Sequence, residues 1–230
     1  MIFLTGDTHR DFDRVEEFCE ENGTTVDDVL IILGDAGINY YLDRDDEVLK
    51  AYLSKLPITL FMLHGNHEER PGEIGSYEET LWRGGIVYWE PDYPNLLFAK
   101  DGEIYDFDGK KTLVIGGAYS VDKYYRLRRG LPWFETEQPD EGTMEYVERQ
   151  LDEVGWRVDC VLTHTAPASY EPTWAFIPGL DQSLVDKTTE KWLDSIERRL
   201  SYNSWYCGHY HVESQEVPVR IMYQEFEELE

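Results

Sequence analysis

Five hydrophobic runs in this chain each end in a short polar motif, and all six histidines lie in four of these motifs. The runs and motifs read I-F-L-T-G-D-T-H (2–9), V-L-I-I-L-G-D (29–35), L-F-M-L-H-G-N-H (60–67), V-L-T-H (161–164) and W-Y-C-G-H-Y-H (205–211). In open α/β sheets, ligands bind beyond the carboxyl ends of the strands. The pattern therefore predicts an α/β fold whose polar chemistry is concentrated at one edge of a sheet.

The polar residues in these motifs are of the types that bind hard or borderline divalent metals. Asp, Asn and His offer oxygen and imidazole ligands, and a closing His-x-His pair adds two more. A lone Asp after a strand is usually a turn or cap residue, and a lone His is more often an ordinary core or surface residue. Five strand ends that all carry ligand-type residues are difficult to explain by chance. Because they exceed what one ion can use, the sequence predicts two metals.

The first 65 residues alternate between strand and helix patterns. Strands are expected at 2–6, 29–33 and 58–64, with helices at about 11–22 and 43–56 between them. The first helix has Asp11 or Asp13 as its expected N-cap. The apolar runs are nearly continuous, as in buried parallel strands, and strand–helix–strand connections are right-handed. A parallel sheet follows from this pattern.

The pattern changes after this region. Residues 86–116 contain short β-rich runs, and Asp108-Gly109 predicts a hairpin between two of them. A second, antiparallel or mixed sheet is therefore expected to pack on the first. Residues 119–142 have the pattern of an irregular basic and aromatic loop. The remaining predicted elements are helices at about 143–154 and 185–200, strands at 158–163 and 204–207, and an edge strand in the tail V-P-V-R-I-M-Y. With no linker visible, residues 1–230 are expected to form a single domain.

Composition restricts the partners and the compartment. The 47 acidic and 21 basic residues give a formal charge of −26, which disfavours long nucleic acid and anionic membrane surfaces. Three widely spaced cysteines argue against a disulfide framework and favour a reducing compartment. There is no signal-peptide pattern and no apolar run of membrane-spanning length. A cytoplasmic protein is expected, and the sequence leaves its oligomeric state open.

As a set and in this order, the motifs G-D-T-H, G-D, G-N-H-E, H and G-H-Y-H resemble those of the calcineurin-like metallophosphoesterases. The resemblance covers nearly the whole chain. It implies an α/β fold in which a β-sandwich of two mixed sheets is flanked by helices, in four layers α/β/β/α. It also implies a dinuclear enzyme that hydrolyses phosphomonoester or phosphodiester bonds of a small substrate or nucleotide. The attacking group would be a metal-bridging hydroxide.

The resemblance also assigns roles to individual residues. Asp7, His9 and His211 would bind one metal ion, and Asn66, His164 and His209 the second. Asp35 would bridge the two ions, and His67 would protonate the leaving oxygen or stabilise the transition state without binding metal. The imidazole ligands allow manganese, iron, zinc or nickel, and manganese is the metal expected, with the other three as alternatives.

Several positions depart from the family pattern. Arg10 replaces a glycine, His64 replaces a phosphate-binding arginine, and Ile38 replaces the aspartate that orients the catalytic histidine in protein phosphatases. Glu68 is one candidate to orient His67 instead, although Glu68, Glu69 and Arg70 have the pattern of surface charges. These departures indicate a small bacterial- or phage-type phosphoesterase. Candidate substrate contacts are Arg10, Asn39, His64, Arg126 and Arg128.

The loop at 119–142 leaves two interpretations open. Its four cations, Lys123, Arg126, Arg128 and Arg129, could hold phosphate or stack on a base, or could form salt bridges on a solvated surface. Two alternative functions also remain. The chain could be a metal-binding scaffold of the same fold, although all the ligand positions are present. It could also be a nuclease, which only the basic loop favours.

Overall fold

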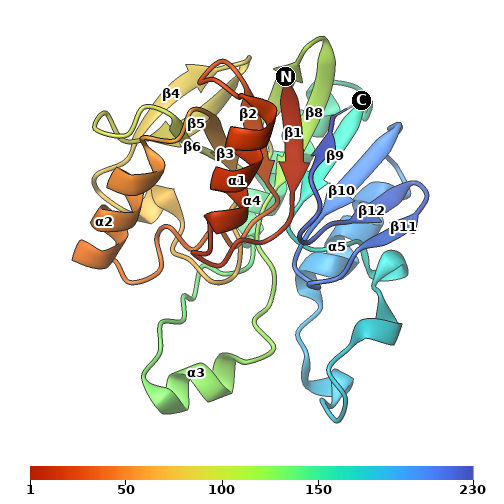
Figure 1. Cartoon of the computed structure of the whole chain (residues 1–230). Helices are drawn as coiled ribbons and strands as arrows, with labels where there is room; N and C mark the ends of the chain where they lie inside the picture. The colour runs from red at the N-terminus through yellow and green to blue at the C-terminus, as the bar shows by residue number, and fades with distance from the viewer. Residues whose placement is uncertain (230) are drawn as a thin grey trace.

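The computed structural model describes residues 1–229, and in that range two mixed sheets make up the core of the protein (Figure 1). The seven-stranded first sheet has the order β13-β1-β2-β3-β6-β5-β4. Strands β1, β2, β3 and β6 are parallel, while β4, β5 and β13 pair antiparallel. The strands of this sheet are β1 (Ile2–Thr5), β2 (Val29–Ile32), β3 (Thr59–Met62), β4 (Glu78–Trp82), β5 (Gly85–Trp89), β6 (Leu96–Ala99) and β13 (Glu227–Glu228).

The six-stranded second sheet has the order β11-β12-β10-β9-β8-β7. Its four central strands are parallel, and an antiparallel strand closes each edge. Its strands are β7 (Ile104–Phe107), β8 (Lys110–Ile115), β9 (Cys160–Thr163), β10 (Ser204–Cys207), β11 (Ser214–Glu216) and β12 (Val219–Ile221). The second sheet is therefore mixed, as expected, and Asp108-Gly109 does form the turn of the β7–β8 hairpin.

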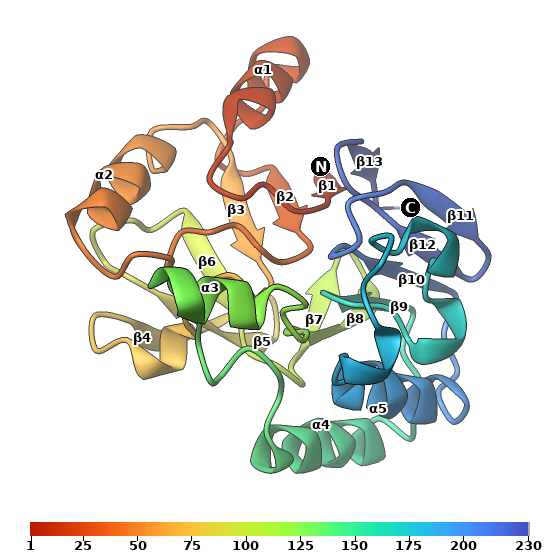
Figure 2. The ribbon, with the colours of Figure 1, turned by 90° about the horizontal axis from the view of Figure 1, so that it is seen from below.

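Helices cover the outer face of each sheet, which gives four layers. Figure 2 shows α1 (Asp13–Asn22) and α2 (Arg44–Leu53) on one side and α4 (Glu141–Glu153) and α5 (Thr188–Glu197) on the other. Three buried hydrophobic clusters correspond to the three interfaces between these layers. Successive strand residues point to opposite faces. In β1, Leu4 accordingly faces the second sheet, whereas Phe3 faces α1.

Five strands deliver their last residues to one end of the sandwich. Polar motifs follow β1, β2 and β3 in the first sheet and β9 and β10 in the second. Because both sheets have parallel cores, the carboxyl ends of these strands meet at the lower edge in Figure 1. Residues more than 200 positions apart in the chain are thereby brought into contact.

Two long excursions, residues 119–140 and 165–187, project beyond this edge as separate arms (Figure 1). The first contains α3 (Lys123–Arg129), which crosses in front of the strand ends in Figure 2. The second contains three short 3₁₀ turns, Ala168–Tyr170, Thr173–Ala175 and Gln182–Leu184. The prediction of an irregular loop over 119–142 was wrong for α3. Gly130, in the left-handed conformation (φ 65°), ends that helix.

Two further local predictions need correction, and one strand was not predicted. The N-cap of α1 is Phe12, not Asp11 or Asp13, and no side chain caps the helix. The tail strand β12 is not an edge strand, because β11 pairs along its outer side. The sequence pattern also did not predict β4, whose two glutamates are typical of a protected edge strand. In the described part of the chain, no helix has the length and hydropathy that a membrane crossing requires.

Candidate metal centre

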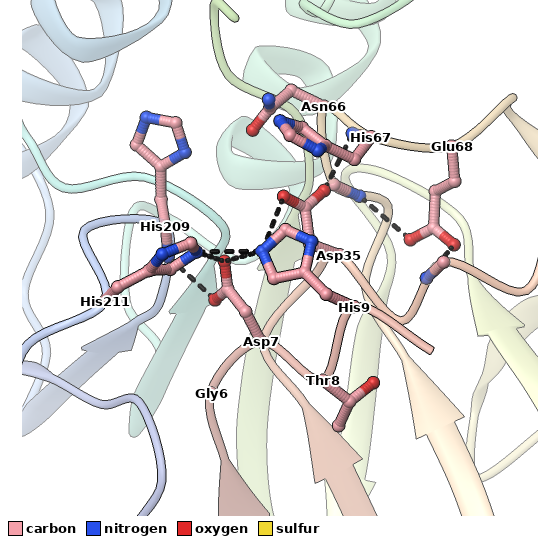
Figure 3. Close-up of polar contacts among 12 residues, drawn as sticks. Gly6, Asp7, Thr8, His9, Asp35, Asn66, His67, Glu68, His209 and His211 are labelled. Atoms are coloured by element: carbon pink, nitrogen blue, oxygen red, sulfur yellow. Dashed lines mark hydrogen bonds and ion pairs between the residues drawn. The ribbon is translucent and has the colours of Figure 1, made fainter. Parts of the chain in front are cut away.

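Three side chains from distant motifs converge where β1 and β10 end (Figure 3). His9 Nε2 lies 2.8 Å from His211 Nε2, and Asp7 Oδ2 lies 3.3 Å from His211 Nε2 and 3.7 Å from His9 Nε2. Asp7 Oδ2 is buried and accepts no hydrogen bond from any described residue. Two ring nitrogens and an unpaired carboxylate oxygen that face one another need a proton or a cation between them. This donor set fits a divalent metal.

A second pair of acceptors faces each other where β3 and β9 end. His164 Nδ1 is 2.8 Å from the Leu33 carbonyl, which can only accept, so Nδ1 carries the proton. His164 Nε2 therefore presents a lone pair, and it lies 2.9 Å from Asn66 Oδ1. The Asn66 amide donates to Ser120 Oγ at 2.9 Å, which fixes its carbonyl oxygen toward His164. Two opposed acceptors in a buried position are explained by a cation that binds both.

Asp35 lies between these two groups. Its Oδ2 is 3.7 Å from His9 Nε2, and its Oδ1 is 3.7 Å from His164 Nε2. Oδ1 also accepts the backbone N–H of His67 at 2.8 Å. The side chain is 1% exposed. One carboxylate oxygen therefore faces each group, as a bridging ligand requires.

His209 is the predicted ligand that lies least close to the others. Its backbone N–H donates to Asp7 Oδ1 at 2.8 Å, and its ring packs edge-on against His164 with centroids 5.0 Å apart. In the described residues, the groups with ligand atoms within 4.8 Å of one another do not include it. Burial lowers the pKa of His209 to about 3, so its ring is neutral and retains a lone pair.

Burial opposes ionisation of the two central carboxyl groups, but the surrounding histidines outweigh it. Burial alone raises the pKa of Asp7, whereas the contact with His211 and the nearby His164 and His9 lower it below its ordinary value. The pKa of Asp35 is likewise lowered by His164 and His67 against the effect of burial. Both side chains are therefore carboxylates at neutral pH and can bind cations.

The backbone around the cluster is held in uncommon conformations. His9, Asp35, His209 and His211 have positive φ angles of 46°, 48°, 69° and 53°. Such residues carry a conformational cost and concentrate at functional sites. Gly65 and Gly208 serve a different purpose, because a Cβ on either would overlap a carboxylate of another motif, Asp35 or Asp7. These glycines permit close approach of the motifs, and neither has a positive φ that only glycine favours.

His67 is held by a residue that the sequence pattern did not connect to it. Arg126 Nη2 lies 2.5 Å from His67 Nδ1, and Arg126 also donates to Asp122 Oδ2 at 2.8 Å and to the Pro132 carbonyl at 3.1 Å. A guanidinium can only donate, so His67 Nδ1 accepts and the neutral ring carries its proton on Nε2. The ring also forms a close group with His9 and Asp35.

The prediction that Glu68 is a surface charge was wrong, and Glu68 as the residue that orients His67 stays a prediction. It is fully buried, and its carboxyl group accepts from the Gly37 and Gly65 backbone N–H groups at 3.1 and 3.3 Å. Burial, reinforced by Asp35, raises the pKa of Glu68 to about 8. Glu68 thus supports the loops that carry Asp35 and Asn66, while Arg126 contacts the ring of His67.

The other predicted substrate contacts are scattered. Arg10 lines a small cavity beside His67, but its guanidinium is paired with Asp46 at 2.5 Å. Asn39 is buried and accepts from the Tyr77 hydroxyl at 3.0 Å. His64 is buried and lines a different cavity, with Arg70 and Asp101, and Arg128 is exposed on α3. Of this set, the structure brings only Arg10 and Arg126 beside His67.

A pocket of about 410 Å³ adjoins the cluster, and its outer walls come from both excursions. Sequence reasoning missed these residues, which include Tyr119, Asp122, Glu171, Phe176, Glu190 and Tyr210. One signal was available: Glu190 precedes Leu193 by three residues on the buried face of α5, where a charged side chain is unusual. The segment 165–187 has no periodic pattern that could have placed it.

Comparison with known proteins found one matching family and similar solved structures. A family model described as calcineurin-like phosphoesterase matches residues 1–213. The solved structure of TT1561 from Thermus thermophilus is similar, with a TM-score of 0.54 and 13% identity over 97% of this chain and 89% of that one. The phosphopantetheinyl hydrolase PptH from Mycobacterium tuberculosis gives a TM-score of 0.41 and 15% identity over 96% of this chain and 87% of that one. No curated protein matches the chain.

Proposed function

The chain belongs to the calcineurin-like phosphoesterase family, and from this premise we propose that it uses two divalent ions to hydrolyse a phosphomonoester or phosphodiester bond of a small substrate. The observation that carries the proposal is the presence of two sets of opposed lone pairs on either side of one carboxylate. Asp7, His9 and His211 form one set, and Asn66 and His164 the other. Asp35 lies between them.

The residues would divide the work as follows. Asp7, His9 and His211 would hold one ion, Asn66, His164 and His209 the other, and Asp35 both. Bound metals of this kind polarise phosphoryl oxygens and favour attack by water in line with the leaving group. Manganese is the metal we propose, with iron, zinc or nickel as alternatives that imidazole ligands also accept.

His67 would act on the substrate and not on a metal. Arg126 Nη2 lies closer to Nδ1 (2.5 Å) than to Nε2 (3.3 Å), so the Nε2–H group would donate to the leaving oxygen or to a phosphoryl oxygen. Arg126 would therefore do what the family aspartate does where Ile38 stands here: it fixes one ring nitrogen so that the other points in a useful direction. It does so as a donor, which selects the Nε2–H form of the ring.

Three features outside the cluster support proposals about the domain organisation, the compartment and the size of the substrate. The motif residues come from both sheets, which share one buried core, so we propose that residues 1–230 form a single domain. The cysteines Cys19, Cys160 and Cys207 are buried free thiols, which suits a reducing, cytoplasmic setting. The charge of −26 favours a small substrate over long DNA or RNA.

The proposal is tested by metal content together with turnover. Protein loaded with manganese, zinc, nickel or iron(II) is assayed with p-nitrophenyl phosphate and bis-p-nitrophenyl phosphate, and metal per chain is measured. We expect about two ions per chain, metal-dependent hydrolysis, and a lower melting temperature after chelation because the ions bind the folded state. Saturation at one ion would refute the dinuclear centre. Two bound ions without hydrolysis of any ester would favour the scaffold alternative.

A further inference from the structure

The pocket beside the cluster has one metal-facing end and one mainly apolar wall. Asp35, Asn66 and His67 line the first, and Phe176, Ile177, Leu180 and Val185 of the second excursion line the other, together with Tyr210. Its volume of about 410 Å³ falls in the range typical of small-molecule sites, roughly 300–1,000 Å³. A phosphate held at the cluster has this pocket directly beside it.

Outside the cluster, the charged side chains that line the pocket are acidic. They are Asp122, Glu171 and Glu190, and among residues 1–229 no Lys or Arg lines it. Two of these carboxylates already have a cation. Lys187 pairs with Glu171 at 2.8 Å, and Arg126 pairs with Asp122 at 2.8 Å. Glu190 alone has no cationic partner in the described part of the chain.

Glu190 presents one unused acceptor. The residue is 4% exposed, and its Oε1 accepts from the Thr165 hydroxyl at 3.0 Å. Its Oε2 is buried and has no hydrogen-bond partner among the described residues. A buried carboxylate oxygen without a donor is costly, and such groups in native proteins are usually paired. Because Glu190 lines the pocket, a ligand is well placed to supply that donor.

The apolar wall is also incompletely covered. Ile177 lines the pocket and is 61% exposed, and the neighbouring Trp174 is 66% exposed. Lys187, which does not line the pocket, lies over the Phe176 ring at 4.7 Å. An apolar body that entered the pocket would cover Ile177 and Phe176 and gain the free energy of that burial.

We propose that this pocket binds the leaving group of the phosphate ester, and that it selects a mainly apolar group with an N–H donor directed at Glu190 Oε2. The proposal rests on the proposed phosphoesterase function and adds the class of substrate. Two sources share this chemistry, the amino group of an aromatic ring, as in a nucleobase, and an alkylammonium. A leaving group with a second phosphate or a carboxylate would face the unpaired carboxyl group of Glu190 and is disfavoured.

The first test uses para-substituted phenyl phosphates that carry methyl, amino, aminomethyl or carboxylate groups. We expect kcat/KM to be roughly tenfold or more higher for the amino or the aminomethyl ester than for the methyl ester, since a hydrogen bond to a charged group is gained. The carboxylate ester should be the poorest substrate. A higher rate for the neutral amino compound indicates an aromatic amine, and a higher rate for aminomethyl indicates an ammonium.

The second test removes the acceptor. Glu190→Gln keeps the shape of the side chain, and we expect the ratio of kcat/KM for amino over methyl esters to fall toward one. Glu197→Gln is the matched control, because it removes a carboxylate from the same helix but does not line the pocket. Benzylphosphonates with the same substituents, which cannot be hydrolysed, give a binding readout by calorimetry. Circular dichroism checks that each variant is folded.

The outcomes of these tests distinguish failure of the pocket proposal from failure of the proposed phosphoesterase function. The parent protein alone can overturn the proposed leaving-group pocket. It would do so by hydrolysing all the substituted esters at equal rates and binding all the phosphonates equally, or by preferring the carboxylate compounds. An unchanged ratio in folded Glu190→Gln would overturn the role of Glu190. In both cases hydrolysis itself would leave the phosphoesterase proposal intact. If no ester is hydrolysed with any metal, the function fails, and the phosphonate affinities still decide the pocket.

Discussion

The strand-end cluster and the two excursions that surround it are built in opposite ways. Cluster side chains follow buried parallel strands within a few residues, and the tight loops hold several of the proposed ligands at positive φ. The excursions at 119–140 and 165–187 consist of one short helix and isolated turns, and they expose large apolar side chains such as Tyr124 and Trp174. If the proposed function holds, the strand ends would carry the phosphate chemistry, and selectivity would depend on the surrounding loop segments, which tolerate sequence change more easily.

The largest effect is expected from the centre of the cluster. Asp35→Asn removes the charge that faces both ligand groups, so turnover should fall by more than about 10³-fold and bound metal should drop to one ion or none. Metal analysis and kinetics on the same sample check this. Asp92→Asn, in an exposed turn, is the matched control. If Asp35→Asn kept its full metal content and full activity, the strand-end cluster would not be the metal centre, and its contrast with the excursions would fail.

His67 is expected to contribute to chemistry without holding metal. His67→Ala should lower kcat by about 10²–10⁴-fold, the usual range for general acid–base groups, and both ions should remain. The loss should be smallest for nitrophenyl esters, whose leaving group needs little protonation. Metal analysis is the decisive measurement, because His67 also forms a close group with His9 and Asp35. Loss of an ion would reassign it as a ligand.

Arg126 tests whether an excursion takes part in chemistry. Arg126→Ala should lower kcat roughly tenfold, because the charge-assisted contact to His67 Nδ1 is lost, with little change in KM. Added guanidinium should restore part of the rate. Arg128→Ala, on the exposed side of the same helix, should change kcat by less than about twofold. Equal losses in both variants would instead support a loop that holds phosphate with all its cations.

The smallest expected effect is that of Glu190→Gln on the free energy of unfolding. Burial raises its pKa to about 7 from an ordinary 4.5, with Glu171 adding to the shift and Lys187 opposing it. The folded state therefore holds this proton more tightly than the unfolded state. Ionisation of Glu190 therefore lowers the free energy of unfolding. This effect is absent below about pH 4.5, grows between pH 4.5 and 7, and is constant above pH 7. Glu190→Gln should thus gain about 1–3 kcal/mol relative to the parent at pH 8, and much less at pH 5.

Urea unfolding of metal-free protein at the two pH values measures this difference. Glu197→Gln controls for the loss of one carboxylate from α5. A gain in stability of Glu190→Gln that is the same at pH 5 and pH 8 would show that ionisation of Glu190 is not its cause. Glu190 would then not be a pocket carboxyl group whose ionisation opposes folding.

The sequence alone determined the parts of this protein that local pattern encodes. Continuous apolar runs such as 29–33 fixed the buried parallel strands, and the residues after them identified Asp7, His9, Asp35, Asn66, His164 and His211, which the structure brings together. Short motifs at strand ends are readable because the carboxyl ends of parallel strands in one layer meet wherever the sheet forms. The match of residues 1–213 to one family model confirmed the resemblance to the calcineurin-like phosphoesterases.

Only the tertiary structure decided what lies around the cluster. Arg126 reaches His67 across 59 residues of sequence, and Glu190 meets the pocket because α5 packs against the second sheet. Glu68 has the sequence pattern of a surface charge, but in the structure it is buried and accepts hydrogen bonds from the backbone of two loops. The physical reason is common to all three. A long-range contact depends on how layers pack and on which charges lose water, and no local period of the chain records either.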